Sequence, residues 1–259
     1  MDFTYKVYDH LLDCILQAGY QVVTVRDYLK GTESQLTLIL RHDVEWNPYR
    51  ALALAKIEEA YGCRSTFYFR VDTKAFHLSI MRQLQEKGFE IGYHFNTLDR
   101  CRGNFQKAIA LFERELEQLR KVGIDVKTVC SHGDPRAPKR GYKVNNEIFL
   151  RDPDLRFRNG LLGEAYLDVD FSRLQYISDA GARWNRISST KELMLRISQK
   201  EWPLIYILVH PDYWSRSPFR AAALQVAAWG VRSFKMNRAI IVGKQVLASL
   251  KRFIGKGYE

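Results

Sequence analysis

The sequence predicts an α/β fold, a distorted (β/α) barrel of about seven strands with a C-terminal helical extension. Short apolar segments alternate with longer segments whose apolar residues recur at helical spacing, which is the pattern of a parallel sheet covered by helices. The length of 259 residues suits one barrel of this kind. Hydrophobic residues make up 46% and charged residues 27%, so the composition is that of a folded protein.

The helices can be placed from apolar spacing and from the residues that bound them. Val7 and Leu11 belong to one apolar face of the first helix, which stops at Gly19. Pro48 suits the first turn of another helix, and Gly62 ends it, because glycine readily adopts the left-handed conformation found after helices. The expected helices span residues 4–19, 25–29, 48–60, 78–87, 105–122 and 191–199.

The strands are expected in the short apolar segments between these helices. They are rich in β-branched and aromatic residues, and several end abruptly at a polar residue, as the segment Leu36–Leu40 does at Arg41. In a barrel of parallel strands the chemistry lies at the carboxyl ends of the strands. The expected strands span residues 21–25, 36–40, 65–71, 89–93, 126–130, 164–169, 174–178 and 204–209.

The net charge of +11 is unevenly distributed. The last 49 residues carry nine basic and two acidic residues, for +7, which leaves only +4 on residues 1–210. Because the positive and negative charges of the barrel nearly balance and no nucleic-acid-binding module is recognised, we expect no nucleic-acid partner. The basic excess instead favours local contact with a membrane face or a phosphorylated carrier.

We divide the chain into a barrel, residues 1–212, and a basic helical extension, residues 213–259. The extension reads as two helices, Phe219–Trp229 and Val231–Ile254, the second of which interleaves aliphatic and basic residues. Two interpretations stay open. The second helix packs on the barrel with a solvated basic face, or it rests on an anionic membrane surface as a peripheral contact.

The expected compartment is the cytoplasm, with the basic helix as a candidate contact to the inner membrane face. Cys14, Cys63, Cys101 and Cys130 show no CxxC spacing, which favours a reducing environment. The first residues lack the basic and apolar regions of a signal peptide. The longest apolar run, Leu204–Val209, is far shorter than a membrane span.

Four of the six histidines directly follow expected strands. These are His42, His94, His132 and His210. Since the carboxyl ends of parallel strands meet at one rim, the four positions predict a shared polar site. The alternative is a coincidence of structural histidines at caps or in the core.

Carboxylates accompany these histidines. Asp43 and Glu45 lie two residues apart at a strand end and would point to the same side if the strand continues. Carboxylates beside imidazoles suit a metal site or acid–base catalysis, although Asp43 could instead cap the next helix and Glu45 could be solvated. Asp179 ends another strand, and Arg183 and Trp184 follow it. Trp184 is either a core residue or a wall on which a sugar stacks.

Five short motifs together resemble those of the polysaccharide deacetylase superfamily, the NodB-homology domains. The resemblance covers about residues 4–212 and is greatest to the branch whose first motif reads Arg-His-Asp-Val-Asp, which is often found with surface-polysaccharide biosynthesis genes. In order along the chain, the motifs read Leu-Arg-His42-Asp43-Val-Glu45, Glu-Ile-Gly-Tyr-His94, Ser-His132-Gly, Ser-Asp179-Ala-Gly-Ala-Arg183-Trp184 and Leu-Val-His210-Pro.

The resemblance implies a distorted (β/α) barrel that hydrolyses an N-acetyl group from a sugar with a divalent metal, usually zinc. Asp43 maps to the general base and His210 to the general acid, while Glu45 and His94 map to metal ligands. A metal-bound water needs a base to lose its proton and the leaving amine needs an acid to gain one.

The sequence departs from the family pattern in its first three motifs. Leu98 stands where a second metal-binding histidine is expected, so His132 is our candidate replacement ligand. Glu45 replaces the usual aspartate, which lengthens that ligand by one methylene. Arg136 is a candidate for orienting the base, although the third motif differs from the usual Arg-x-Pro-Tyr. We also assign a catalytic role to Asp179 and expect four residues to bind the substrate, namely Arg41, His42, Arg183 and Trp184.

The leading hypothesis is a metal-dependent deacetylase acting on an N-acylated sugar that is nucleotide-linked or lipid-linked, in surface-polysaccharide or glycolipid precursor synthesis. A second hypothesis is a metal-free deacetylase-fold protein that binds a glycan precursor or scaffolds a membrane-side assembly. A third keeps acid–base catalysis by Asp43 and His210 but dispenses with the metal. Metal content and activity after chelation distinguish the three.

Overall fold

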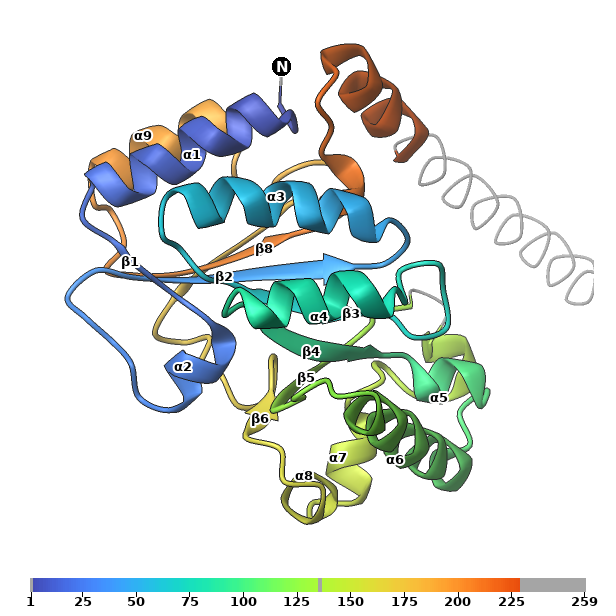
Figure 1. Cartoon of the computed structure of the whole chain (residues 1–259). Helices are drawn as coiled ribbons and strands as arrows, with labels where there is room; N and C mark the ends of the chain where they lie inside the picture. Colours follow the sequence, from blue (N-terminus) through green and yellow to red (C-terminus); the bar gives the residue numbers. More distant parts are fainter. Residues whose placement is uncertain (1, 135–136, 229–259) are drawn as a thin grey trace, which may run out of the picture.

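The structure is a computed structural model that describes residues 2–134 and 137–228. Within them, parallel strands form one curled sheet with helices on its outer side (Figure 1). Seven strands run in the order β6-β5-β4-β3-β2-β8-β7, and β1 pairs with the first half of β2. The predicted α/β fold, a distorted (β/α) barrel, is confirmed. The strands are β1 Gln21–Val23, β2 Thr37–Val44, β3 Thr66–Phe69, β4 Glu90–Phe95, β5 Thr128–Ser131, β6 Gly163–Glu164, β7 Gln175–Ser178 and β8 Leu204–Val209.

The helices cover the outer face of this sheet. α1 and α9 lie side by side, and α3 packs over β2 (Figure 1). α3 begins at Pro48 as predicted, because the Asn47 side chain accepts a hydrogen bond from the backbone N–H of Tyr49 and caps the helix start. The helices are α1 Tyr5–Gln17, α2 Val25–Leu29, α3 Pro48–Ala60, α4 Leu78–Glu86, α5 Thr97–Arg100, α6 Phe105–Lys121, η1 Ala137–Arg140, α7 Glu147–Arg151, α8 Leu155–Arg158, α9 Thr190–Ser198 and η2 Pro211–Tyr213.

The two faces of β2 have different surroundings. Successive side chains of a strand point to opposite faces. Arg41 and Asp43 point to the inner side of the curled sheet, where Tyr206 and Cys130 contact the Arg41 guanidinium. His42 points outward to side chains of α1 and α3. This alternation decides which residues of the first motif can take part in a site inside the barrel.

Most strands differ in length from the prediction, and the contacts of β2 and β6 explain their differences. β2 continues to Val44, past the predicted end at Leu40, because Arg41 and Asp43 neutralise each other inside the sheet. β6 contains only Gly163–Glu164 where residues 164–169 were expected. The Glu164 carboxylate accepts hydrogen bonds from the backbone N–H groups of residues 166 and 167, which turns the chain away from the sheet.

The predicted C-terminal extension is described only in its first part. Residues 218–228 are helical, which agrees with the helix expected from Phe219. The second expected helix, Val231–Ile254, lies outside the described residues. Trp214 is fully buried and Ser215 pairs with Thr4, so contact with the barrel continues past residue 212.

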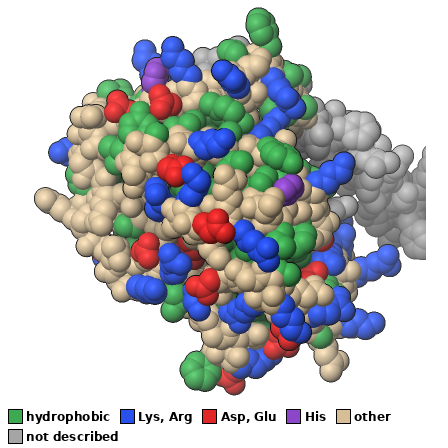
Figure 2. All heavy atoms as spheres, in the orientation of Figure 1, with side chains coloured by type: hydrophobic (Ala, Val, Ile, Leu, Met, Phe, Trp, Pro, Cys, Tyr) green, Lys and Arg blue, Asp and Glu red, His purple; other side chains and the backbone are tan. Residues whose placement is uncertain are grey.

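Two further observations concern the protein surface. On the face drawn in Figure 2, Lys and Arg side chains are scattered among acidic and hydrophobic ones. Of the helices in residues 2–134 and 137–228, none is long and apolar enough to cross a membrane.

Candidate active site

The candidate site lies where β2, β4, β5 and β8 end. Asp43 and His94 are the next-to-last residues of β2 and β4, while His132 and His210 directly follow β5 and β8. Parallel pairing from β8 through β2, β3 and β4 to β5 brings these ends to one rim. Three of the four predicted histidines therefore surround Asp43 and its neighbour Glu45.

Arg41 holds Asp43 from beneath. Its Nε and Nη2 atoms donate hydrogen bonds of 2.8 and 2.7 Å to the two carboxylate oxygens of Asp43, and both side chains are buried. The hydroxyl oxygens of Tyr166 and Tyr206 lie 3.1 and 3.2 Å from the same guanidinium and accept from it. Burial alone would raise the pKa of Asp43, but the Arg41 charge and then the neighbouring His94 keep that pKa well below its ordinary value. Asp43 is thus a fixed, ionised carboxylate.

His94 presents an unprotonated nitrogen to the carboxylates. Its Nδ1 lies 3.1 Å from the backbone carbonyl oxygen of Cys130, and since a carbonyl can only accept, Nδ1 carries the proton of the neutral ring. Nε2 lies 3.7 Å from Asp43 Oδ2 and 4.0 Å from Glu45 Oε1. Burial outweighs the Asp43 charge and lowers the pKa of His94 to about 4, so the imidazole is neutral near pH 7. An anchored Nδ1–H with a free Nε2 is the arrangement of metal-binding histidines.

His132 lies between two carboxylates. Its Nε2 is 3.3 Å from Glu45 Oε1, and its Nδ1 is 3.8 Å from Asp99 Oδ2. Burial would lower the pKa of His132, but Asp99 and Glu45 outweigh it and raise the pKa to about 9. Glu45 in turn has a pKa of about 2, because its hydrogen bond with His132 and the nearby charge of His210 overcome burial. A metal bound by His132 would therefore have to displace a proton.

His210 is paired with the buried carboxylate of Asp179. Nδ1 of His210 donates a 2.7 Å hydrogen bond to Asp179 Oδ1, and the indole N–H of Trp214 donates at 2.8 Å to Oδ2. Burial would lower the pKa of His210, but Asp179, followed by the charges of Asp43 and Glu45, raises it to about 9. The site thus holds an imidazolium whose Nε2 is not used by Asp179.

One set of possible metal ligands was not foreseen. The ligand atoms of Asp43, His94 and Cys130 all lie within 4.8 Å of one another, which among the described residues makes them a candidate metal group. Cys130 has no partner cysteine at CxxC spacing, and its signal in the sequence is its place two residues before His132, on the strand that His132 follows. Arg41 Nη2 already lies 2.5 Å from the Cys130 sulfur, so a second cation would be repelled there.

Asp212 is a second residue that the sequence did not single out. Its carboxylate accepts hydrogen bonds from the backbone N–H groups of Glu45, Trp46 and Asn47, at 3.2, 3.0 and 2.9 Å. Since Asp212 follows His210 by two residues, it ties the turn that carries Glu45 to the loop that carries the imidazolium. Its signal in the sequence was only its proximity to His210.

Several predicted substrate-binding residues lie away from this rim. His42 is fully buried, and its Nε2 lies 2.7 Å from Glu58 Oε1 on the outer side of the sheet. Trp184 is 6% exposed and packs against Phe3 and Trp214, away from this rim, and it also lines a separate cavity. Its expected role as a wall on which a sugar stacks stays a prediction. Arg41 is buried beneath Asp43, so its side chain is not open to a ligand from solvent.

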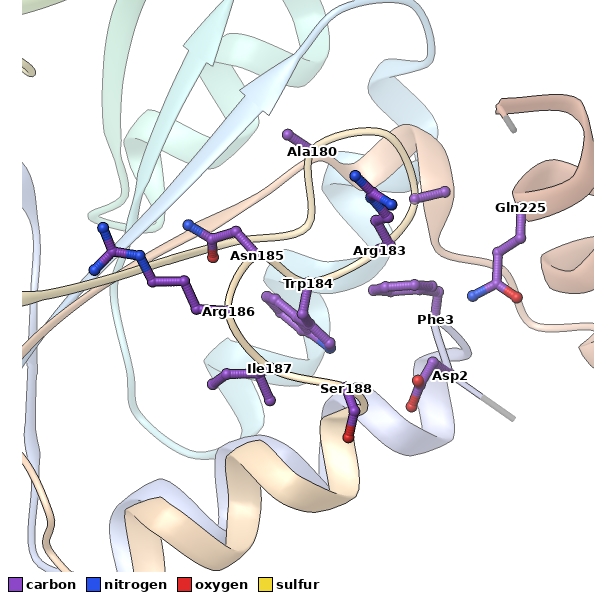
Figure 3. A pocket seen from close by; sticks show the side chains of 11 residues that line it. Asp2, Phe3, Ala180, Arg183, Trp184, Asn185, Arg186, Ile187, Ser188 and Gln225 are labelled. Atoms are coloured by element: carbon purple, nitrogen blue, oxygen red, sulfur yellow. The ribbon is translucent and has the colours of Figure 1, made fainter. Parts of the chain in front are cut away.

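Arg183 is exposed and lines a separate cavity of about 700 Å³ with Asp2, Phe3 and Gln225 (Figure 3). None of Asp43, Glu45, His94, His132 or His210 lines that cavity. Figure 3 shows Arg183 and Arg186 pointing in different directions from their loop, so the two cations do not converge on one ligand. Arg136 lies outside the described residues, and its expected role toward Asp43 stays a prediction.

Comparisons with known proteins give a likeness of fold only. Neither a protein-family model nor a curated protein matches the sequence. One similar solved structure is a mutant CE4 family pseudoenzyme with restored enzymatic activity, at 12% identity and a TM-score of 0.39 over 78% of this chain. The chain spans 64% of the length of that protein. Another is the CE4 domain of a multidomain xylanase from the hindgut metagenome of Trinervitermes trinervoides, at 15% identity and a TM-score of 0.36, over 77% of this chain and 83% of that one.

Proposed function

We propose that this protein is a hydrolase that removes an N-acetyl or related acyl group from a sugar. The observation that carries the proposal is the pairing of opposite charges at one rim. Arg41 fixes Asp43 as a carboxylate, and Asp179 fixes His210 as an imidazolium whose pKa responds to the charge of Asp43. A base and an acid with widely separated pKa values are what amide hydrolysis needs.

Each of these residues has a distinct task in the proposed reaction. Asp43 accepts a proton from the water whose oxygen adds to the acyl carbon. His210 then donates its Nε2 proton to the amide nitrogen as the carbon–nitrogen bond breaks, which yields a carboxylic acid and an amino sugar. Arg41 and Asp179 are positioning residues, because each holds one of these two groups without facing the substrate.

A divalent metal fits the chemistry of the remaining side chains. Glu45, His94 and His132 are the proposed ligands, since Glu45 Oε1 lies 4.0 Å from His94 Nε2 and 3.3 Å from His132 Nε2. His94 is neutral with its Nδ1 anchored, as a zinc ligand requires. When bound, such a metal polarises a carbonyl group and makes water more acidic. The group of Asp43, His94 and Cys130 shares only His94 with this set.

The substrate and setting follow from charge and from the resemblance of the motifs. We propose an N-acylated sugar linked to a nucleotide or a lipid, as used in surface-polysaccharide or glycolipid synthesis at the cytoplasmic side of a membrane. The basic residues 211–259 support a phosphorylated or membrane-bound carrier. The resemblance of five motifs supports the acylated sugar.

The direct test is acid release from acylated sugars, with and without metal. Zinc-replete protein should release acetate from at least one member of a panel of free, nucleotide-linked and lipid-linked N-acetyl sugars. Chelation should abolish the release and added zinc should restore it. A protein that holds no zinc and releases no acetate, yet binds a glycan, would instead support the metal-free binding protein.

The ligand set has its own prediction. His94→Ala should lower zinc affinity by at least about 100-fold, because it removes the one imidazole that is already deprotonated. Cys130→Ser should keep one zinc per chain, because Arg41 occupies the sulfur. Elemental analysis after dialysis measures both. Loss of zinc from Cys130→Ser, with retention in Glu45→Gln, would assign the metal to the group that contains the cysteine.

The raised pKa of His210 predicts the alkaline limit of the reaction. A proton donor must be protonated, so kcat should stay high up to about pH 9 and fall as the imidazolium loses its proton above that value. Asp179→Asn removes the charge that raises this pKa, so the alkaline limb should move down toward the ordinary value of 6.5. A profile of kcat against pH for both proteins measures the shift. An alkaline limb at the same pH in both would exclude His210 as the proton donor held by Asp179.

A further inference from the structure

Trp46 is an exposed aromatic residue at the edge of the candidate site. It directly follows Glu45, and its side chain is 60% exposed. The two other described tryptophans near this end of the sheet, Trp184 and Trp214, are buried in the core. An exposed indole next to polar side chains can offer its aromatic face to a ligand.

The backbone that carries Trp46 is held on both sides. Its own N–H and those of its two neighbours donate to the Asp212 carboxylate, and Thr73 Oγ1 donates a 2.5 Å hydrogen bond to the carbonyl oxygen of Glu45. The next residue, Asn47, caps α3. Trp46 is therefore presented on a turn fixed relative to both Glu45 and His210. A rigid aromatic residue beside polar groups binds ligands at low entropic cost.

Other aromatic side chains extend this rim. Tyr49 is 63% exposed, and its hydroxyl lies 3.2 Å from His77 Nε2, on the loop that follows β3. Phe76, beside His77, is also exposed. Exposed aromatic side chains thus lie on the segments that follow β2 and β3, while the histidines and carboxylates of the site are charged or polar. A ligand that fits both has an apolar face and a polar, reactive edge.

We propose that Trp46 is the sugar-stacking residue of this site, an inference that rests on the proposed function. A pyranose ring has a C–H face that packs on the negative face of an indole, and hydroxyl or acylamino groups at its edge. Because Trp46 directly follows Glu45, a sugar stacked on the indole would lie beside the turn that carries this carboxylate. Trp46 takes the role that the sequence suggested for Trp184.

The test is sugar binding by Trp46 variants of the full chain. The probes are N-acetylglucosamine, its β-linked trimer and UDP-N-acetylglucosamine. Titration calorimetry and tryptophan fluorescence measure their binding. For the probe that wild type binds most tightly, Trp46→Ala should bind about 10-fold more weakly, and Trp46→Phe should retain most of the affinity. Wild-type fluorescence should change on binding, and this change should be absent from Trp46→Phe although the sugar still binds. Where a probe is hydrolysed, KM should rise by a similar factor with kcat nearly unchanged.

Phe157 provides the matched control. It is 88% exposed on α8, which lies far from the carboxyl end of β2 (Figure 1), so Phe157→Ala should bind every probe as wild type does. Affinity of Trp46→Ala within twofold of wild type, or no fluorescence response to any probe, overturns the stacking role. If Trp46→Ala releases acetate with an unchanged KM, the stacking role of Trp46 is wrong and the proposed hydrolase activity still holds. If sugar binding depends on Trp46 but no acid is released, the stacking role holds and the proposed hydrolase activity is wrong.

Discussion

Asp43→Asn should reduce acetate release by about 10³-fold or more at saturating substrate, the largest effect on activity expected of any single change. The variant keeps the shape of the side chain and one acceptor for Arg41, but it has no carboxylate to take a proton from water. Positioned acid–base groups contribute about 10²–10⁴-fold. The change also leaves the buried Arg41 charge without its counter-ion, which adds disorder at the site. Initial rates at several temperatures below the unfolding midpoint separate lost chemistry from lost folding.

A similar ion pair just after the neighbouring strand β3 provides the control. Arg70 donates to both oxygens of Asp72 at 2.9 Å, with the same spacing of two residues as Arg41 and Asp43. Asp72→Asn should weaken that pair and reduce stability, yet reduce the rate by less than about tenfold, because Asp72 faces Asn96 and not the histidines. Equal losses of rate in the two variants would show that Asp43 acts through folding alone.

The longer helices and most strands could be predicted because their signals are local, whereas the short helices α5, α7 and α8 were not predicted. Pro48 and Asn47 fix the start of α3 whatever surrounds it, and Gly19 and Gly62 follow α1 and α3 closely. The end of β2 could not be predicted in this way. Charged residues normally end a buried strand, but here the pairing of Arg41 with Asp43 lets the strand continue to Val44.

The continuation of β2 also decides which residues of the first motif lie on the inner face of the sheet. Once the strand includes residues 41–43, alternation sends Arg41 and Asp43 inward and His42 outward. Of the four histidines that were expected to share one site, His42 therefore lies on the opposite face of the sheet. Cys130 and Asp212 depend on contacts between strands that are distant in sequence, and such contacts leave no periodic pattern. Trp46 is exposed and Trp184 is buried. The sequence could not distinguish them, because residue type alone does not indicate burial.

Arg41→Met should produce the largest loss of stability, about 3–5 kcal/mol in the free energy of unfolding. Arg41 is fully buried, and its guanidinium is the charge that keeps Asp43 ionised inside the sheet. Methionine fills much of the same volume but leaves a buried carboxylate unpaired. The pKa of Asp43 should then rise, because burial is no longer opposed by a neighbouring cation. Urea unfolding at constant pH measures the loss from the midpoint and slope.

The double variant Arg41→Met/Asp43→Leu distinguishes an unpaired charge from a lost shape. Two apolar side chains of suitable size should recover most of the stability, since replacing both members of a buried pair is often neutral, yet the protein should stay inactive. The pH dependence gives a second readout. In wild type the depressed pKa of Asp43 stabilises the fold above the unfolded value, and this contribution is lost as pH falls through the folded pKa. In Arg41→Met the buried carboxylate becomes neutral on acidification, so the gap in stability to wild type should narrow as pH falls. A single variant as stable as wild type at pH 7 would mean that Arg41 does not stabilise the fold. A double variant no more stable than the single would mean that Arg41 contributes by packing and not by holding the Asp43 charge.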